Sequence, residues 1–227
     1  MGTERALEVL AAGPLTLVQD LGRVGFASVG VGRSGAVDRG AFCLGARLLA
    51  QPYTSAALEV TLGGLSVRAR GDVLLALTGA PSPADVDGRG VGYCGPFALA
   101  DGQVLTLGTP PVGLRTYVSV RGGVNVPTVL GSRATDTLSG LGPEPVQAGD
   151  IVPVGAPPAD FPNVDQAPTA ALSNETLVLR ALRGPGELDA GRVDEHVEVA
   201  GEQRRQRLGE AEVADLDDVV VCRCEHD

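Results

Sequence analysis

Glycine and proline interrupt this chain so often that long helices are excluded from most of it. The sequence contains 32 glycines and 16 prolines in 227 residues, but only four Phe, three Tyr and no Trp. Proline lacks a backbone N–H and glycine favours turns, so both tend to end regular elements. This composition predicts many short strands joined by tight turns.

Four stretches have the pattern of strands, and one has the pattern of a helix. The predicted strands are residues 65–70, 73–78, 103–108 and 115–121. The first alternates apolar and polar residues, as a half-buried strand does. Between residues 38 and 51 apolar residues recur at helical spacing, and Ser34 or Asp38 is available as the N-cap. We therefore expect a mainly β fold, a β-barrel-like domain with few helices.

The composition divides the chain into three parts. Residues 1–155 are predicted to form the β domain, and the proline-rich residues 156–175 a semi-extended linker. Residues 176–182 read as one further strand. Residues 187–227 hold 13 acidic residues and 5 arginines, without Phe or Tyr. A segment so charged is poorly able to bury a core, so we expect this divergent acidic end to be solvated or loosely packed.

The chain contains no lysine, because all 18 of its basic residues are arginine. This absence excludes a Schiff-base lysine, a biotinylated lysine, a lysine-dependent amidase triad and a complete Walker A loop. Both histidines, His196 and His226, lie near the C-terminal end. The first 186 residues therefore have no histidine for a catalytic triad or a histidine-based metal site.

Charge and hydropathy exclude further classes of partner. The net charge of −10 opposes binding to a nucleic acid backbone. No apolar run approaches the roughly 18 to 20 residues needed to cross a bilayer. The first residues lack the charged-then-apolar order of a signal peptide. A cytoplasmic protein is expected.

The four cysteines do not indicate a disulfide scaffold or a metal site. Cys43 and Cys94 stand alone and are expected to be small buried apolar side chains. Cys222 and Cys224 lie close to His226, but this group lacks a fourth ligand and the usual C-x2-C spacing. No metal is expected.

Three clusters of polar residues could form a site. In the first, residues 19–23 and 30–38, the glycines let the chain bend and bring polar side chains together. Asp20 and Arg23 could pair and Asp38 could cap the helix, so a structural and a catalytic role are equally open. The G-x-G-x-x-G spacing within 30–35 does not indicate dinucleotide binding, because no suitable acidic residue follows about 20 residues on.

The second cluster is the strand 115–121. Alternation places Arg115, Tyr117, Ser119 and Arg121 on one face, which suits a carboxylate or phosphate ligand. A solvent-facing strand surface is the other interpretation, and the Gly-Gly pair that follows favours a site, because it permits close approach. In the third cluster, residues 131–136, Ser132 has no histidine base, and Arg133 reads as an anion clamp or as the partner of Asp136.

At these clusters the sequence resembles the allophanate hydrolase subunit 2 family, which includes the C-subunit of 5-oxoprolinase, the Kip sporulation-kinase antagonist and the carboxyltransferase module of urea amidolyase. The matching motifs lie at residues 16–23, 34–38, 57–61, 77–80, 113–123, 131–136 and 149–150. The resemblance covers residues 13–155 and, more weakly, 177–185. Ala134 replaces a serine usual in the family, and the family's last strands have no clear match here.

The resemblance implies a cyclophilin-like β-barrel and a partner, the family's subunit 1. It implies that a third subunit joins a 5-oxoprolinase complex that uses ATP, with no cofactor bound covalently to this chain. The motifs hold the candidate catalytic residues Asp20, Asp38 and Glu59. They also hold the candidate substrate-binding residues Arg23, Arg115, Tyr117, Arg121, Ser132 and Arg133.

The leading hypothesis is therefore a subunit of an ATP-dependent amide hydrolase, the C-subunit of 5-oxoprolinase, inactive or weakly active alone. One alternative is a non-catalytic regulatory binding protein like the Kip antagonist. The other is a carboxyltransferase component acting on biotin that another protein carries. An arginine-rich strand face suits the small anionic amide that a 5-oxoprolinase opens.

Overall fold

The computed structural model describes residues 5–169, together with two strands at 177–182 and 219–224. The chain separates into two compact units, Met1–Leu172 and Ser173–Asp227. The first unit holds every candidate site residue. Nothing in its described part is a helix long and apolar enough to span a membrane.

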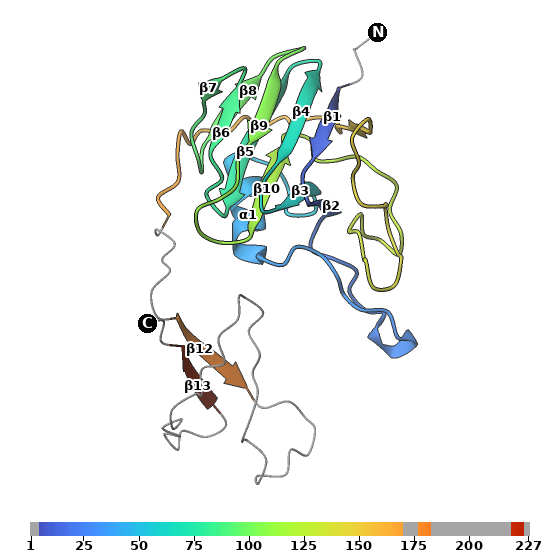
Figure 1. Cartoon of the computed structure of the whole chain (residues 1–227). Coiled ribbons are helices and arrows are strands. Elements are labelled where there is room, and N and C mark those ends of the chain that lie inside the picture. Colours follow the sequence, from blue (N-terminus) through green and yellow to red (C-terminus); the bar gives the residue numbers. More distant parts are fainter. Residues whose placement is uncertain (1–4, 170–176, 183–218, 225–227) are drawn as a thin grey trace. The chain divides into compact units, whose positions relative to one another are not determined.

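The first unit is built from two antiparallel sheets (Figure 1). The six-stranded sheet has the order β11-β1-β4-β9-β6-β7, with β1 (Ala6–Ala12), β4 (Leu65–Arg70), β6 (Ala84–Val86), β7 (Arg89–Gly90), β9 (Val104–Leu107) and β11 (Ile151–Pro153). The five-stranded sheet has the order β2-β3-β10-β5-β8, with β2 (Leu15–Gln19), β3 (Ala57–Thr61), β5 (Val73–Gly79), β8 (Pro96–Leu99) and β10 (Arg115–Val120). A short 3-10 turn, η1 (Ala27–Val29), and one helix, α1 (Arg39–Leu48), complete the unit. The expectation of a mainly β fold with few helices is confirmed.

The two sheets enclose one apolar core of leucine and valine. Leu7 and Val67 face inward from the first sheet, and Leu58, Leu75 and Val118 from the second. The alternation predicted for residues 65–70 is present, because burial alternates along β4. Each inward side chain removes apolar area from water, worth about 25 cal/mol per Å2.

Loops close the gaps between the sheets. Val124 pairs with Ala56 next to β3 and with Val154 next to β11, so it joins the end of one sheet to the edge of the other. The outer edge of β2 is covered in the same way, since Thr135 N donates to Val18 O and Val146 N to Thr16 O, at 2.8 and 2.9 Å. These contacts satisfy strand edges that would otherwise invite further pairing.

Helix α1 packs across β5 and β10 of the second sheet. Its Phe42 meets Tyr117 of β10 edge to face, with ring centroids 6.0 Å apart. Asp38 is the N-cap, because its Oδ1 accepts a hydrogen bond from Ala41 N at 2.9 Å. This settles the choice between the two predicted caps. Glycine at position 45 lets the helix approach closely, since a Cβ there would lie 2.3 Å from Ser119 Oγ.

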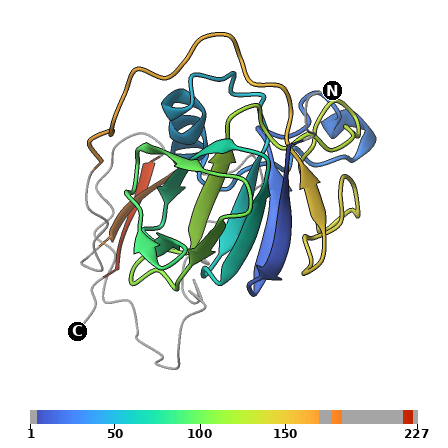
Figure 2. The ribbon, with the colours of Figure 1, turned by 90° about the horizontal axis from the view of Figure 1, so that it is seen from above.

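Residues 156–169 of the proline-rich segment, which was expected to be a linker, belong to the first unit and contact the rest of it (Figure 2). Ala167 N donates to Cys94 O at 2.8 Å, and Gln166 Nε2 to Tyr93 O at 3.0 Å. Gly95 permits this approach, because a Cβ there would lie 2.4 Å from Asp165 O. The segment is therefore held on the surface of the unit by backbone contacts that composition does not reveal.

The second unit contains β12 (Leu177–Leu182) and β13 (Val219–Cys224), which pair antiparallel from Leu177 opposite Cys224 to Leu182 opposite Val219. The strand predicted at 176–182 is confirmed over 177–182. Part of the acidic end, expected to be loosely packed, is thus a paired strand. The rest of residues 187–227, His196 and His226 among them, lies outside the described residues.

Gly45→Ala should destabilise the first unit, although in a helix interior alanine is normally more favourable than glycine by about 1 kcal/mol. The new Cβ would collide with Ser119, so we expect a loss of about 1–3 kcal/mol in the free energy of unfolding. Urea denaturation measures it. Gly40→Ala in the same helix is the control, because its Cβ would meet only Asp38 Oδ1 at 3.4 Å. Ser119→Gly should restore stability to Gly45→Ala; absence of rescue contradicts the packing argument.

Candidate functional site

A buried carboxylate, Glu59, organises the polar residues between β3, β10 and the start of α1. Glu59 on β3 is 1% exposed, and Tyr117 lies directly opposite it in the β10 register. Tyr117 Oη donates to Glu59 Oε2 at 2.7 Å and accepts from Asp38 N at 2.8 Å. Val37 N donates to the same Glu59 oxygen at 3.0 Å. Two side chains of the sheet therefore hold the backbone that leads into α1.

Besides the exposed Asp38, Arg115 is the member of this group that reaches solvent. Its Nε lies 3.6 Å from Glu59 Oε1, and the Arg115 side chain is 23% exposed. Its Nη1 donates to Thr61 Oγ1, whereas Nε is buried and makes no hydrogen bond. A part-exposed arginine held by one carboxylate can still pair with an anion. We refer to Asp38, Glu59, Arg115 and Tyr117 as the Glu59 cluster.

Burial raises the pKa of Tyr117 well above its ordinary range, and the hydrogen bond to Glu59 raises it further. Both effects favour the neutral phenol, because an ionised Tyr117 would face the Glu59 carboxylate away from water. Burial likewise raises the pKa of Tyr93. Tyr117 is thus a hydrogen-bond donor at neutral pH rather than a base.

A second carboxylate, Asp20, joins two loops beyond the end of β2. Asp20 Oδ1 accepts from Gly22 N and from Ser132 Oγ, both at 2.7 Å, and Oδ2 accepts from Arg133 N at 2.6 Å. Ser132 Oγ in turn accepts from Ala134 N at 3.0 Å. Asp20 therefore stabilises the loop that follows β2 and the loop at 129–136 together.

Arg23 does not pair with Asp20 as the sequence suggested, since no ion pair joins them in the described part of the chain. Its side chain is 2% exposed, and it donates to the carbonyl oxygens of Ala134 and Val129 at 2.5 and 3.4 Å. Three donors from the loops already occupy the Asp20 carboxylate, so Arg23 turns to backbone carbonyls instead. Arg23 Nη1 makes no hydrogen bond. We refer to Asp20, Arg23, Ser132 and Arg133 as the Asp20 cluster.

The other two arginines also bind backbone oxygens. Arg133 Nε donates to Val126 O at 2.8 Å and Nη2 to Asn125 Oδ1 at 3.2 Å. Arg121 is buried, and its Nη2 donates to Asp160 O and to Pro158 O, the latter at 2.9 Å. Its guanidinium lies 5.0 Å from the Phe161 ring. Arg121 thus holds the segment that follows β11. This segment covers the Arg121 side chain, at the position where a ligand on this strand face would contact Arg121.

The nine candidate residues accordingly form two clusters and one isolated arginine. Segment 20–38 connects the clusters, because Asp20 lies at its start and Asp38 at its end. Sequence reasoning considered Asp136 only as a possible partner of Arg133, whereas its carboxylate accepts from the hydroxyls of Ser34 and Ser139 at 2.8 and 2.6 Å. Hydrogen bonds from Ser139 and then Ser34 hold the pKa of Asp136 well below its usual range. Its position in the predicted third cluster was the available signal.

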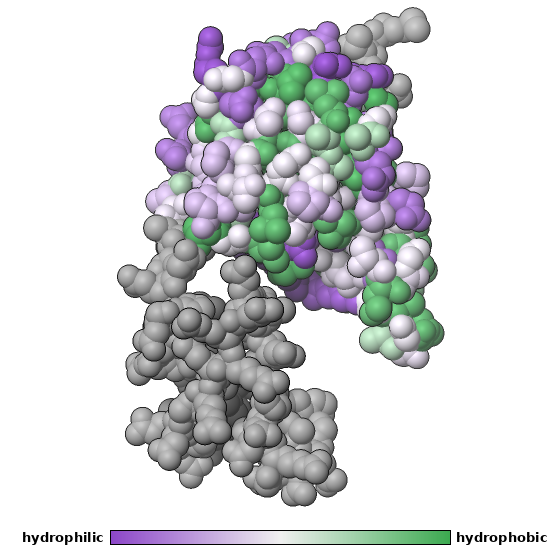
Figure 3. All heavy atoms as spheres, in the orientation of Figure 1, coloured by the Kyte–Doolittle hydropathy of each residue, from purple (hydrophilic) through white to green (hydrophobic). Residues whose placement is uncertain are grey.

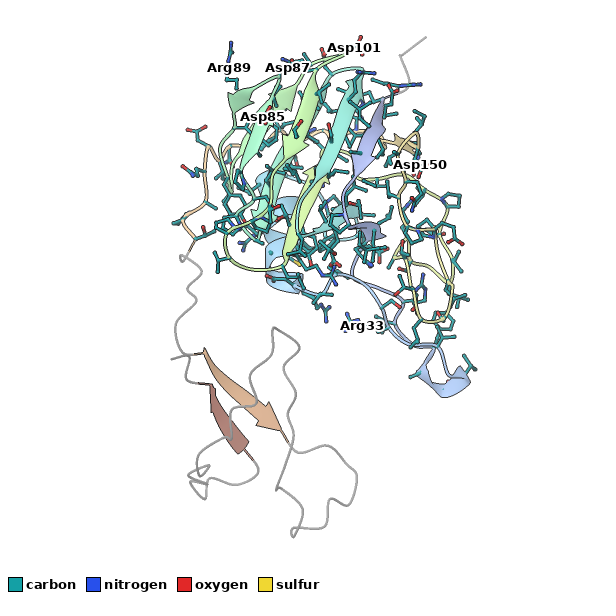
Figure 4. All side chains as sticks on the ribbon, in the orientation of Figure 1. Arg33, Asp85, Asp87, Arg89, Asp101 and Asp150 are labelled. Atoms are coloured by element: carbon teal, nitrogen blue, oxygen red, sulfur yellow. The ribbon has the colours of Figure 1, made fainter. Side chains whose placement is uncertain are left out.

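Other features of the described unit are weaker candidates for a site than the two clusters. In residues 5–169 and the two later strands, no group of three His, Cys, Asp or Glu side chains could hold a metal. Cys94 is buried, as expected, whereas Cys43 is partly exposed. A hollow of about 320 Å3 near Asp87 and Arg89 lies at the opposite end of the unit from Arg33 (Figure 4). The two clusters, which concentrate buried charge, are the better candidates.

Tyr117→Phe should lower stability at neutral pH by about 1–3 kcal/mol, because Glu59 loses the hydrogen bond from the phenol and Asp38 N loses its acceptor. The substitution should also make stability fall less steeply with pH above about pH 10. In the folded protein Tyr117 keeps its proton there, whereas the unfolded chain releases it, so stability falls as pH rises.

The absence of lysine makes this measurement clean, since only tyrosine and cysteine titrate between about pH 9 and 11. Urea denaturation at several pH values gives the slope. Tyr53→Phe is the control, because Tyr53 is 45% exposed. Equal slopes of stability against pH for wild type and Tyr117→Phe would contradict the raised pKa of Tyr117.

Comparison with known proteins places this arrangement in a family. Residues 29–198 match the family described as carboxyltransferase domain, subdomain A and B. This range includes the Glu59 cluster, and it continues beyond residue 185, where the resemblance was expected to end. Asp20 and Arg23 precede it.

Three relatives illustrate the similarity. The chain is 36% identical over 182 residues to the C-subunit of 5-oxoprolinase from Escherichia coli (strain K12), covering 79% of this chain and 58% of that protein. It is 36% identical over 138 residues to urea amidolyase of Saccharomyces cerevisiae, covering 60% of this chain and 8% of that protein. The crystal structure of K. lactis urea amidolyase superposes with a TM-score of 0.70 and 31% identity, covering 77% of this chain and 11% of that one. The chain therefore spans less than two thirds of each of these proteins. With most of its length matched in sequence and fold, it belongs to the carboxyltransferase domain family, subdomain A and B.

Proposed function

We propose that this chain is the C-subunit of a 5-oxoprolinase, a component of an ATP-dependent complex that opens 5-oxoproline to glutamate together with a subunit 1 partner. The observation that carries the proposal is the 36% identity to a protein of that name over 79% of this chain. The chain spans 58% of that relative, so the activity of the whole complex is part of the proposal. The proposal includes a cytoplasmic location.

The Glu59 cluster supports the proposal with a suitable anion contact. 5-Oxoproline carries a carboxylate beside its cyclic amide, and a guanidinium binds a carboxylate through charge-assisted hydrogen bonds. Arg115 is part-exposed and pairs with a single carboxylate, Glu59. In this proposal Arg115 binds the substrate carboxylate, while Glu59 and Tyr117 hold Arg115 and the start of α1 in position.

Catalytic roles for Asp20, Asp38 and Glu59 remain part of the proposal. Asp38 is the most accessible of the three, whereas Asp20 and Glu59 are buried and occupied by several donors. An accessible carboxylate beside a helix N-terminus is suited to act on a substrate bound at Arg115. ATP would be used by the complex, and this chain offers no lysine to its phosphates.

The family match favours one other function, carboxyl transfer from a biotin carried by a different protein. The matched family is described by its carboxyltransferase domain, and urea amidolyase is among the relatives. A guanidinium that binds the carboxylate of 5-oxoproline would equally bind a carboxyl group in transfer. The two functions differ in their products, so one assay separates them.

Reconstitution tests the proposal directly. The chain is mixed with the subunit 1 and third-subunit proteins of the same genome, 5-oxoproline and ATP, and glutamate is measured. We expect ATP-dependent glutamate release by the mixture and little from any component alone. Release that is unchanged when this chain is omitted would overturn the proposal. Carboxylated product from a biotinylated carrier, without glutamate, would favour carboxyl transfer.

Arg115→Gln should raise the KM for 5-oxoproline in the active mixture by about 10- to 100-fold, because the substrate loses a charge-assisted contact of about 1.5–3 kcal/mol. Arg68→Gln is the matched control, since Arg68 is a similar part-exposed arginine that pairs with Glu8 at 3.4 Å on the other sheet. An unchanged KM in Arg115→Gln, with thermal stability equal to wild type, would remove Arg115 from the substrate site.

A further inference from the structure

The segment that follows β11 is anchored at two points and arches between them. We refer to residues 156–165 as the arch. At its start, Gly155 N donates to Gly123 O at 2.9 Å. At its end, the hydrogen bonds of Gln166 and Ala167 to the chain around Cys94 hold the backbone. The arch is therefore tied down on both sides by contacts that do not involve its own residues.

Between these anchors, one side chain holds the arch. Within the described residues, every hydrogen bond between the arch and the rest of the unit comes from Arg121, whose Nη2 donates to Pro158 O and Asp160 O. The Phe161 ring adds its contact with the same guanidinium, 5.0 Å from the ring centroid. Arg121 is thus the only polar link that must break for the described part of the arch to lift.

Apolar packing contributes little to holding the arch. None of its residues is buried, and Phe161 is 74% exposed. The apolar side chains on the face shown in Figure 3 gather instead at the projecting end that carries η1 in Figure 1, whereas the arch runs on the side of α1 (Figure 2). A segment with few buried contacts and few hydrogen bonds opens locally at low cost.

The arch satisfies the Arg121 guanidinium incompletely. Arg121 is 5% exposed and forms no ion pair within the described part of the chain. Both carbonyl oxygens of the arch bind Nη2, whereas Nε is buried without a hydrogen bond. Nε and Nη2 lie on one edge of the planar guanidinium, and a carboxylate binds such an edge through two parallel hydrogen bonds. A buried cation that meets only neutral oxygens also lacks a counter-ion.

We propose that Arg121 is a binding site for a small carboxylate and that the arch is its lid. The carboxylate replaces the two carbonyl oxygens at Nη2 and accepts a hydrogen bond from Nε as well. Bonds to an ionised acceptor are about twice as strong as bonds to a neutral one, and the displaced carbonyls turn to water. The ligand is small, because the arch stays anchored at both ends.

This inference does not rest on the proposed function. The carboxylate contact assigned there is Arg115, which begins β10, whereas Arg121 follows the other end of that strand. Acetate, which has no cyclic amide to open, is the probe. Failure of the Arg121 site would leave the reconstitution experiment untouched, and failure of that experiment would leave this site standing.

Nuclear magnetic resonance of the nitrogen-15 labelled chain tests the site. Sodium acetate replaces sodium chloride at constant ionic strength while the Arg121 Nε–H resonance is followed. We expect this resonance to shift and saturate, because Nε gains an acceptor. The Arg133 Nε–H resonance is the control and should not move, since this group already donates to Val126 O at 2.8 Å.

Two variants of Phe161 test the lid. Phe161→Ala removes the ring from the guanidinium and loosens the arch, so acetate should bind about 2- to 5-fold more tightly. Val164→Ala is the matched control on the arch, since none of the Arg121 contacts involves Val164, which is 41% exposed. Phe161→Trp introduces the one tryptophan of the chain, and its fluorescence should change with acetate but not with chloride. Thermal unfolding of each variant shows whether the unit stays folded.

The outcomes test the site and the lid separately. An Arg121 resonance that acetate leaves in place, or that shifts equally in chloride, overturns the site. A saturating shift with tighter binding to Phe161→Ala supports both the site and the lid. The same shift with unchanged or weaker binding to Phe161→Ala overturns the lid. Saturation by inorganic phosphate at a lower concentration than acetate overturns the assignment to carboxylates.

Discussion

Two buried carboxylates, Asp20 and Glu59, determine where segment 20–38 lies. Asp20 holds the start of segment 20–38 through Gly22 and Ser132, and Glu59 holds its end through Val37 and Tyr117. A buried carboxylate is costly unless several donors satisfy it, and each of these has at least two. The segment between them is therefore fixed at both ends on the β unit, although its middle is exposed.

The same anchors connect the two clusters of the candidate site. Tyr117 contacts Glu59 and the backbone of Asp38, the N-cap of α1, whereas Ser34 in the same segment contacts Asp136 of the second loop. A displacement of these loops would therefore bear directly on the start of the helix beside Arg115.

Arginine has an unusual range of roles in this lysine-free chain. Arg23, Arg121 and Arg133 donate to backbone carbonyls and hold loops, whereas Arg115 pairs with a carboxylate and reaches solvent. The planar guanidinium presents several donors and suits this bridging of loop carbonyls. Residues that look equivalent in the sequence as anion-binding arginines are thus divided by their surroundings into structural and accessible ones.

Local pattern was sufficient for part of the elements and for the excluded chemistries. The spacing of apolar residues predicted β4, β5, β9, β10 and α1 closely, because periodicity reports which face of an element is buried. Composition alone excluded lysine and most histidine chemistry.

Tertiary structure decided which polar residues meet. Asp20 and Ser132 are 112 residues apart, and Tyr117 and Glu59 are 58 apart. Such contacts depend on strand order and on loops folding over sheet edges, which no local pattern records. For that reason the division of the candidate residues into two clusters, the occupied Arg121 and the docked proline-rich segment emerged only from the fold.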